Sequence, residues 1–169
     1  MASIYGSTTV DAGYTWQLRL DYTITQDEEA NQSTLSCTLY VKPGSAGGYN
    51  EVANSAYYVI CGAKTYKTYN FTSTSWVKLG SRTITVEHED DGSKSYTLSA
   101  SWVSDNKTYY TPASISLSET IALPQINRGT AWINVAGTWK EAFSWVNVSG
   151  VWKRAVPWIN VDGTWKKGI

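Results

Sequence analysis

Residues 15–25 read TWQLRLDYTIT and alternate apolar with polar side chains over their whole length. Successive side chains of a β-strand point to opposite faces, so this stretch predicts a strand with one buried face and one wet face. The buried face would carry Trp16, Leu18, Leu20, Tyr22 and Ile24. The wet face would carry Gln17, Arg19, Asp21 and Thr23.

The same alternation recurs along the first three quarters of the chain. It is found near residues 35–41, 84–86, 98–102 and 115–123, with shorter candidates at 57–60 and 66–71 and a first strand near 4–10. Residues 42–48 (KPGSAGG) predict a loop, and residues 90–93 (DDGS) predict a tight hairpin turn. Seven or eight strands and no amphipathic helix indicate an all-β fold, an antiparallel β-sandwich.

The pattern breaks at residues 123–129, LPQINRG, where proline cannot donate to a central strand ladder and glycine ends regular structure. We therefore expect two domains, a β-sandwich over residues 1–126 and a separate module over residues 127–169.

The second module consists of a repeat with a period of 13 residues. Its copies are WINVAGTWK at 132–140, WVNVSGVWK at 145–153 and WINVDGTWK at 158–166. Two short apolar runs around an Xaa-Gly step predict a β-hairpin, because Gly137, Gly150 and Gly163 can adopt the positive φ that such a turn needs. Three tandem hairpins follow from the three copies.

A two-residue turn at Ala136-Gly137 would place Asn134 opposite Trp139 and make both faces of the hairpin apolar. An isolated hairpin is marginally stable in water. The hairpins would then have to pack on each other, on the sandwich or on other copies of the chain. We expect a homo-oligomer, with a trimer favoured.

The tryptophan repeats allow two interpretations. Flat indoles stack on the C–H faces of sugars while a neighbouring asparagine binds hydroxyls, which predicts a glycan site. Aromatic residues are also enriched in interfaces, which predicts a packed core or an oligomer contact. The residues concerned are Trp132, Asn134, Trp139, Trp145, Asn147, Trp152, Trp158, Asn160 and Trp165.

Composition argues against several classes of function. The 14 basic and 14 acidic side chains cancel, which disfavours nucleic acid as a partner. One histidine, two cysteines and the lack of a glycine-rich phosphate loop indicate no metal or other cofactor. The sequence has neither a signal peptide nor an apolar run long enough for a bilayer, so we expect no membrane partner and synthesis in a cytoplasm.

Residues 87–92, EHEDDG, gather four carboxylates around the only histidine. Their spacing fits no calcium loop, so we interpret His88, Asp91 and Gly92 as parts of a structural turn. A glycan hydrolase would need two suitably spaced carboxylates, and Glu87, Asp90 and Glu119 are the candidates. We expect no enzymatic activity.

Five further positions remain open. Cys37 and Cys61 could pair across the sandwich, but a reducing compartment favours two buried free thiols. The aromatic residues Trp76, Tyr109 and Tyr110 adjoin predicted loops or strand ends, where sandwiches commonly hold binding residues.

Three segments together resemble the β-sandwich module of minor structural proteins from tailed phages of Gram-positive bacteria. They are TVEHEDDGSK at 85–94, LSAS at 98–101 and IALP at 121–124. Glu89 and Asp90 stand where that module usually has Asn and a small residue, and Asn127-Arg128 replaces its Pro-Arg pair. The tail also resembles repeats at the ends of phage tail and fibre proteins.

The resemblance implies a virion protein, tail or surface associated, made in the host cytoplasm and released by lysis. Its implied partners are other virion proteins and host cell-wall polysaccharide. The leading hypothesis is therefore a non-enzymatic structural or accessory adhesion protein. The alternative is a stand-alone carbohydrate-binding module of a wall-targeting system.

Overall fold

The computed structural model describes residues 1–44, 49–51, 56–67, 69–71, 73–89, 91–104, 110–126 and 131–167, without the side chains of residues 49–51, 70, 141, 154 and 167. Every regular element in these residues is a β-strand. The first ten strands are β1 (Ala2–Thr9), β2 (Thr15–Asp27), β3 (Gln32–Lys42), β4 (Tyr49–Glu51), β5 (Tyr57–Ile60), β6 (Ala63–Tyr66), β7 (Tyr69–Phe71), β8 (Val77–Glu87), β9 (Ser95–Val103) and β10 (Ser114–Ala122). Within the described ranges, no helix is long and apolar enough to cross a bilayer.

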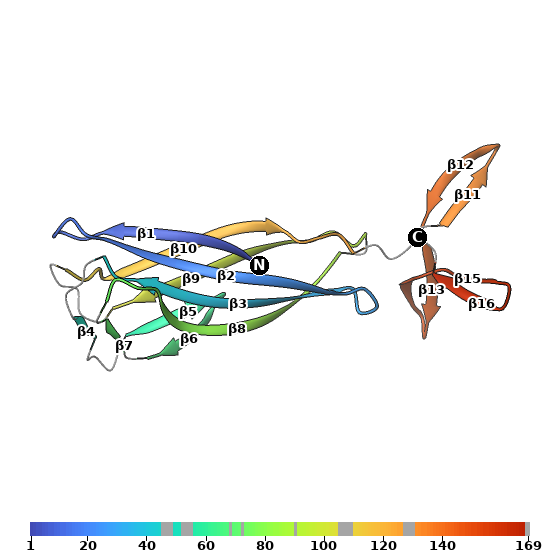
Figure 1. The fold of residues 1–169 in the computed structure, drawn as a ribbon. Helices are drawn as coiled ribbons and strands as arrows, with labels where there is room; N and C mark the ends of the chain where they lie inside the picture. Colours follow the sequence, from blue (N-terminus) through green and yellow to red (C-terminus); the bar gives the residue numbers. More distant parts are fainter. Residues whose placement is uncertain are drawn as a thin grey trace. The chain divides into compact units, whose positions relative to one another are not determined.

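These strands form the predicted sandwich (Figure 1). One sheet has the order β1-β2-β3-β8 and the other β10-β9-β5-β6, while β4 and β7 pair as a small separate ladder. The pairs β1–β2, β9–β10, β5–β9 and β5–β6 are all antiparallel. The predicted all-β class and antiparallel sandwich are confirmed.

An aromatic cluster fills the core. Trp16 from one sheet and Trp102 from the other are fully buried and stack with their ring centres 5.4 Å apart and their planes at 4°. The Phe71 ring meets both indoles at 90°. The apolar face predicted for residues 15–25 is buried over Trp16, Leu18 and Leu20, so the alternation identified the core side of β2 correctly.

The DDGS turn differs from the prediction in what it connects. β8 and β9 flank it, but they belong to different sheets, so the chain crosses from one layer to the other instead of forming a hairpin. A turn-forming sequence specifies that the chain reverses and leaves open which strand each arm pairs with. Residues 42–71 also differ, because they contain three short strands in addition to β5, which raises the strand count above the predicted seven or eight.

The position of Asp21 in β2 also differs from the prediction. It was predicted on the wet face, yet it is only 6% exposed. Its Oδ1 accepts a hydrogen bond from the Ser3 hydroxyl at 2.7 Å and lies 3.0 Å from Nε of Arg19. A buried carboxylate requires such partners, and β1 supplies one of them by pairing with β2 at Ser3 and Asp21.

Three two-stranded hairpins follow. They are β11–β12 (Ala131–Val135 and Thr138–Ala142), β13–β14 (Ser144–Val148 and Val151–Ala155) and β15–β16 (Trp158–Val161 and Thr164–Lys167). The chain divides into two compact units, and the second contains Gln26–Ser33, Glu87–Lys94 and Leu123–Ile169. Residues 127–130 lie outside the described residues, so the domain boundary at 126 stays a prediction.

Candidate binding surfaces

Each tail hairpin closes with the two-residue turn that the repeat predicts. Val135 pairs with Thr138 and Asn134 with Trp139, and the other two hairpins repeat this register. The two turn residues have positive φ in every copy, as in Ala136 at 52° and Gly137 at 85°. Both angles belong to the left-handed region, which gives a type I′ turn whose twist matches that of a β-hairpin.

Both faces of the first hairpin are apolar and exposed. One face carries Trp132, 60% exposed, with Trp139, 64% exposed. The other carries Ile133 and Val135, which are also exposed. The later hairpins repeat this distribution, and their exposed apolar side chains are Trp145, Val146, Val148, Val151, Trp152, Trp158, Ile159, Val161 and Trp165.

The asparagine of each repeat holds its turn. Oδ1 of Asn134 accepts a hydrogen bond from the backbone N–H of Gly137 at 2.8 Å. Asn147 and Asn160 make the equivalent bonds at 2.9 Å. The amide oxygen thereby uses one of its two lone pairs for the turn, while the amide nitrogen keeps both of its N–H groups for other contacts.

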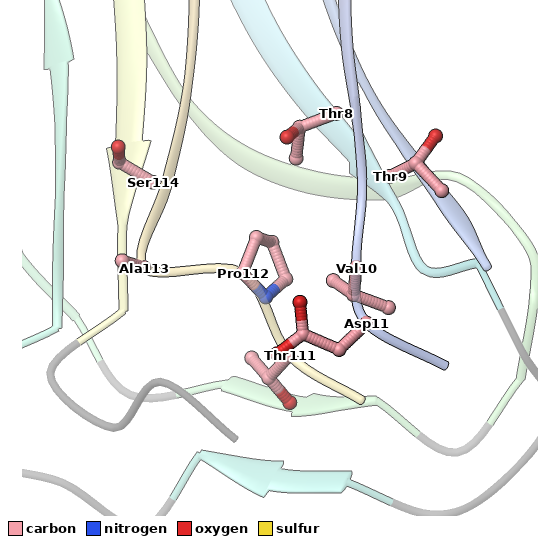
Figure 2. Close-up of a pocket in the computed structure, with 8 residues that line it drawn as sticks. All are labelled: Thr8, Thr9, Val10, Asp11, Thr111, Pro112, Ala113 and Ser114. Atoms are coloured by element: carbon pink, nitrogen blue, oxygen red, sulfur yellow. The ribbon is translucent and has the colours of Figure 1, made fainter. Parts of the chain in front are cut away.

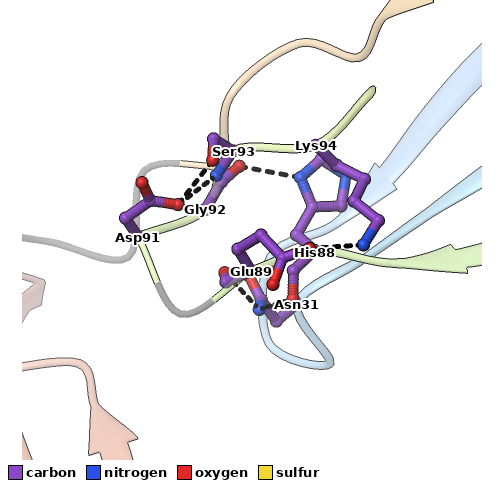
Figure 3. A network of polar contacts seen from close by, with 7 residues as sticks. All are labelled: Asn31, His88, Glu89, Asp91, Gly92, Ser93 and Lys94. Carbon is purple, nitrogen blue, oxygen red and sulfur yellow. Dashed lines mark hydrogen bonds and ion pairs between the residues drawn. The ribbon is translucent and has the colours of Figure 1, made fainter. Parts of the chain in front are cut away.

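The only histidine is built into the turn after β8 (Figure 3). His88 is 7% exposed, and its Nδ1 donates to the carbonyl oxygen of Gly92 at 2.7 Å, because a carbonyl can only accept. Its Nε2 lies 2.8 Å from the hydroxyl of buried Ser33. Asn31 adds two bonds from Nδ2, to the carbonyl oxygens of His88 and Glu89. The ring has protein partners at both nitrogens, which is the environment of a structural histidine.

The segment that follows β10 packs on the same turn. The N–H of Ile126 donates to the Gly92 carbonyl at 3.0 Å, and that of Leu123 donates to Lys94 at 2.8 Å. Ile126 is 1% exposed, so the segment is anchored by an apolar side chain as well. This contact explains physically why the His-Asp-Gly turn and the Leu-Pro-Gln-Ile segment occur in one sequence.

The acidic side chains near this turn make local contacts. Asp91 accepts hydrogen bonds from the N–H and hydroxyl of Ser93, and Glu89 forms an ion pair with Lys94. Among the described residues, no group of three or more His, Cys, Asp or Glu side chains could hold a metal ion. Asp90 lies outside the described residues. Glu87 and Glu119 are both exposed at the surface.

An aromatic cluster that no local sequence pattern predicts lies on the outer face of the first sheet. The Arg19 guanidinium carbon lies 4.6 Å from the ring centres of both Tyr40 and Trp76. Tyr5, 62% exposed, lies 6.4 Å from Trp76. Tyr5 pairs with Arg19 across β1 and β2, but that register depends on the strand pairing and cannot be read from local sequence. The Trp76 ring therefore makes a cation–π contact with Arg19, which also forms an ion pair with Asp21.

Tyr110 directly precedes Thr111, which lines one pocket of the sandwich (Figure 2). Its ring stacks on Tyr14 with centres 6.3 Å apart, and its carbonyl accepts a hydrogen bond from the Trp16 indole at 2.9 Å. The pocket measures about 210 Å³ and is lined by Thr8, Thr9, Val10, Asp11, Thr111, Pro112, Ala113 and Ser114. That volume is below the roughly 300–1,000 Å³ typical of small-molecule sites. Tyr109 lies outside the described residues.

The two cysteines are free. Cys37 is buried as expected, whereas Cys61 is half-buried, so the prediction of two buried thiols is wrong for Cys61. The reason is its position, since Cys61 follows the last residue of β5 and begins the turn into β6.

A family model described as a siphovirus protein of unknown function (DUF859) matches residues 1–142. The match covers the whole sandwich and the first hairpin. No curated protein and no solved structure matches the chain. The resemblance to a tailed-phage protein is thus confirmed, while the likeness of the tail repeats to fibre repeats stays a prediction.

Proposed function

Since the chain belongs to this family of siphovirus proteins, we propose that it is a structural part of the virion, associated with the tail or particle surface. We further propose that it assembles with copies of itself through the tryptophan hairpins, and that the assembled hairpins contact host cell-surface glycan.

The exposure of both faces of the hairpins is the observation that carries the proposal. A two-stranded hairpin is marginal in water, and fully burying one large apolar side chain contributes roughly 1.5–3 kcal/mol. Trp139, Trp152 and Trp165 are 64%, 65% and 64% exposed in the single chain. Covering them and the opposite faces would supply the stability that an isolated hairpin lacks.

Further copies of the chain fit these surfaces better than an unrelated partner. The repeat presents the same surface three times in one chain, with the same register and turn. Hairpins that are apolar on both faces can stack, each covering its neighbour. A closed cyclic oligomer would bury them without leaving a growing end, and we favour a trimer.

Glycan contact is supported by the chemistry of the exposed indoles. Indole faces stack on sugar rings, and one such contact is weak. Many copies on one particle would raise the effective affinity through simultaneous binding. A stand-alone carbohydrate-binding module is the second candidate, favoured by the similar exposure of Trp139, Trp152 and Trp165.

Light scattering on the full chain tests assembly. We expect the wild type to have a multiple of the chain mass, and a variant carrying Ile133→Thr, Val146→Thr and Ile159→Thr to be a monomer. The matched control is Tyr5→Thr with Tyr66→Thr, which removes side chains 62% and 61% exposed on the sandwich and should keep the oligomer. A wild type that is monomeric at every concentration would refute assembly.

Cosedimentation with purified cell-wall polysaccharide tests the glycan contact. Trp139→Ser, Trp152→Ser and Trp165→Ser together should abolish binding, while the Tyr5 and Tyr66 control should retain it. Binding by a monomeric wild type would favour the stand-alone module. Equal binding by the tryptophan variant would exclude the hairpins as the contact.

A further inference from the structure

The two cysteines lie on opposite sheets of the sandwich. Cys37 lies in β3 and is 1% exposed, while Cys61 begins the turn between β5 and β6. β3 belongs to the first sheet, and β5 and β6 belong to the second. The largest electrostatic influence on each thiol comes from the other one, so their side chains approach each other between the layers.

The neighbouring strand β8 carries a residue that links the strand of Cys37 to Cys61. Oγ1 of Thr38 and Oγ of Ser81 are 3.0 Å apart, which places Thr38 and Ser81 opposite each other on β3 and β8. The His88 N–H donates to the Asn31 carbonyl just beyond the ends of the same two strands, so their residues pair in antiparallel order. The pair next to Thr38 and Ser81 is then Cys37 and Arg82, on the other face. Cys37 is in the core, so Arg82 extends from the same face of the sheet.

Arg82 then reaches across to the opposite sheet. Its Nη1 donates to the carbonyl oxygens of Ile60 and Cys61. The N–H of Cys61 donates in turn to the Ser99 carbonyl at 2.7 Å. The two Arg82 bonds hold the Cys61 backbone next to the strand pair that carries Cys37, and the Ser99 bond fixes it to β9 of its own sheet.

The turn itself restricts Cys61 further. Cys61 has a φ of 45° and Gly62 a φ of 86°, and Ile60 pairs with Ala63 across them. A cysteine in the left-handed region costs roughly 1 kcal/mol relative to glycine, so the turn chemistry alone would not select it. The thiol is presented by a closed, two-residue turn instead of a mobile loop.

We propose that Cys37 and Cys61 are a redox modification site, at which a low-molecular-weight disulfide such as glutathione disulfide converts the two thiols into a disulfide that joins the two sheets.

The surroundings assign different roles to the two thiols. Four interactions outweigh burial and lower the pKa of Cys61 to about 6. In order of size, they are the hydrogen bond from Cys37, a hydrogen bond to the thiol from the Ser99 backbone, one with the Tyr96 side chain and the charge of Arg82. The bond that it donates to Cys61 and its burial raise the pKa of Cys37. Cys61 is therefore the attacking thiolate, and Cys37 is the thiol that resolves the intermediate.

The exchange proceeds in two displacements. The Cys61 thiolate attacks one sulfur of glutathione disulfide, forms a mixed disulfide and releases one glutathione thiolate. Cys37 gives its proton to that thiolate or to water and attacks Sγ of Cys61, which releases the second glutathione. Two protein thiols are oxidised to one disulfide, and one glutathione disulfide is reduced to two thiols.

For a virion protein, the bond would form after release from the host, since a bacterial cytoplasm keeps thiols reduced. That timing rests on the proposed function, whereas the disulfide chemistry does not. The bond would close a loop of about 25 residues and stabilise the sandwich by restricting its unfolded state.

The test is to equilibrate the folded full chain with excess glutathione disulfide and to measure intact mass and peptide connectivity. We expect a mass lower by two hydrogen atoms, a Cys37–Cys61 peptide link and a melting temperature higher by roughly 5–10 °C that reductant reverses. A folded wild type that keeps two free thiols, or that stops at a glutathione adduct, would overturn the proposal.

Two variants separate the roles of the thiols. Cys37→Ser should accumulate one glutathione on Cys61, at a rate that rises with pH around 6 and levels off above it. Cys61→Ser should remain unmodified while folded, because Cys37 is buried. Modification of Cys37 first, or a rate that keeps rising to pH 8.5, would contradict the assigned order. If the serine variant does not fold, Cys37→Ala replaces it for the mass measurement alone, because alanine removes the hydrogen bond that lowers the pKa of Cys61.

Discussion

Gly92 shows two separate physical demands meeting at one residue. Its φ is 78°, and a β-carbon there would overlap the Ile126 carbonyl oxygen. Gly92→Ala should therefore lose roughly 2–4 kcal/mol of unfolding free energy, combining left-handed strain with the displacement of the Leu123–Ile126 segment. Urea unfolding measures this loss.

Gly13 provides the matched control for that variant. Its φ is 81°, but a β-carbon there would have no described atom within 4 Å. Gly13→Ala should lose only the strain component, roughly 1 kcal/mol. Equal losses at both positions would show that the contact with Ile126 contributes nothing.

Asn134 tests whether the repeated asparagine is a turn residue. Asn134→Ala removes the acceptor of the Gly137 N–H, and a bond of this kind contributes roughly 0.5–1.5 kcal/mol. Hydrogen exchange at the Gly137 amide should accelerate by about fivefold as a result. Asn134→Asp keeps an oxygen at the same place and should preserve the protection. Unchanged exchange in the alanine variant would mean that the bond does not hold the turn.

At the scale of strands, β1 and β10 close one edge of the sandwich by direct approach (Figure 1). A β-carbon on Gly6 would overlap the Ser116 carbonyl oxygen and lie 3.1 Å from the β-carbon of Leu117. Gly6→Ala should force the edges apart and cost roughly 1–3 kcal/mol in thermal unfolding. Ser7→Ala, on the exposed side of β1, should change stability by less than about 0.5 kcal/mol. If Gly6→Ala does not change the thermal stability, β1 and β10 can move apart at this edge without a cost in free energy.

Strand alternation and turn chemistry could be read from the sequence because both are local. The burial of Trp16, Leu18 and Leu20 follows from period-two patterning, and the hairpin register at Ala136-Gly137 follows from the turn type. The layer crossing between β8 and β9 could not be read, because pairing partners are chosen by tertiary packing. The burial of Asp21 was missed for the same reason.

The candidate sites also differ in whether a local sequence pattern predicts them. The repeats located the hairpin surface, since six of the nine tryptophans lie in them. The cluster of Tyr5, Arg19, Tyr40 and Trp76 joins residues distant in sequence, so no local pattern predicts it.

At the scale of the whole molecule, tryptophan emission reports chiefly on the hairpins. Trp16 and Trp102 are fully buried in the sandwich, whereas the six hairpin indoles are exposed in the single chain. If copies of the chain cover the hairpins, dilution should dissociate them, because association depends on concentration. The emission maximum should then move to longer wavelength as the indoles become hydrated.

The variant with Ile133→Thr, Val146→Thr and Ile159→Thr should emit at the long-wavelength position at every concentration. The contrary outcome is a wild-type emission maximum that equals that of this variant and does not change across a thousandfold dilution. The indoles of the isolated chain would then face water and be available to a ligand instead.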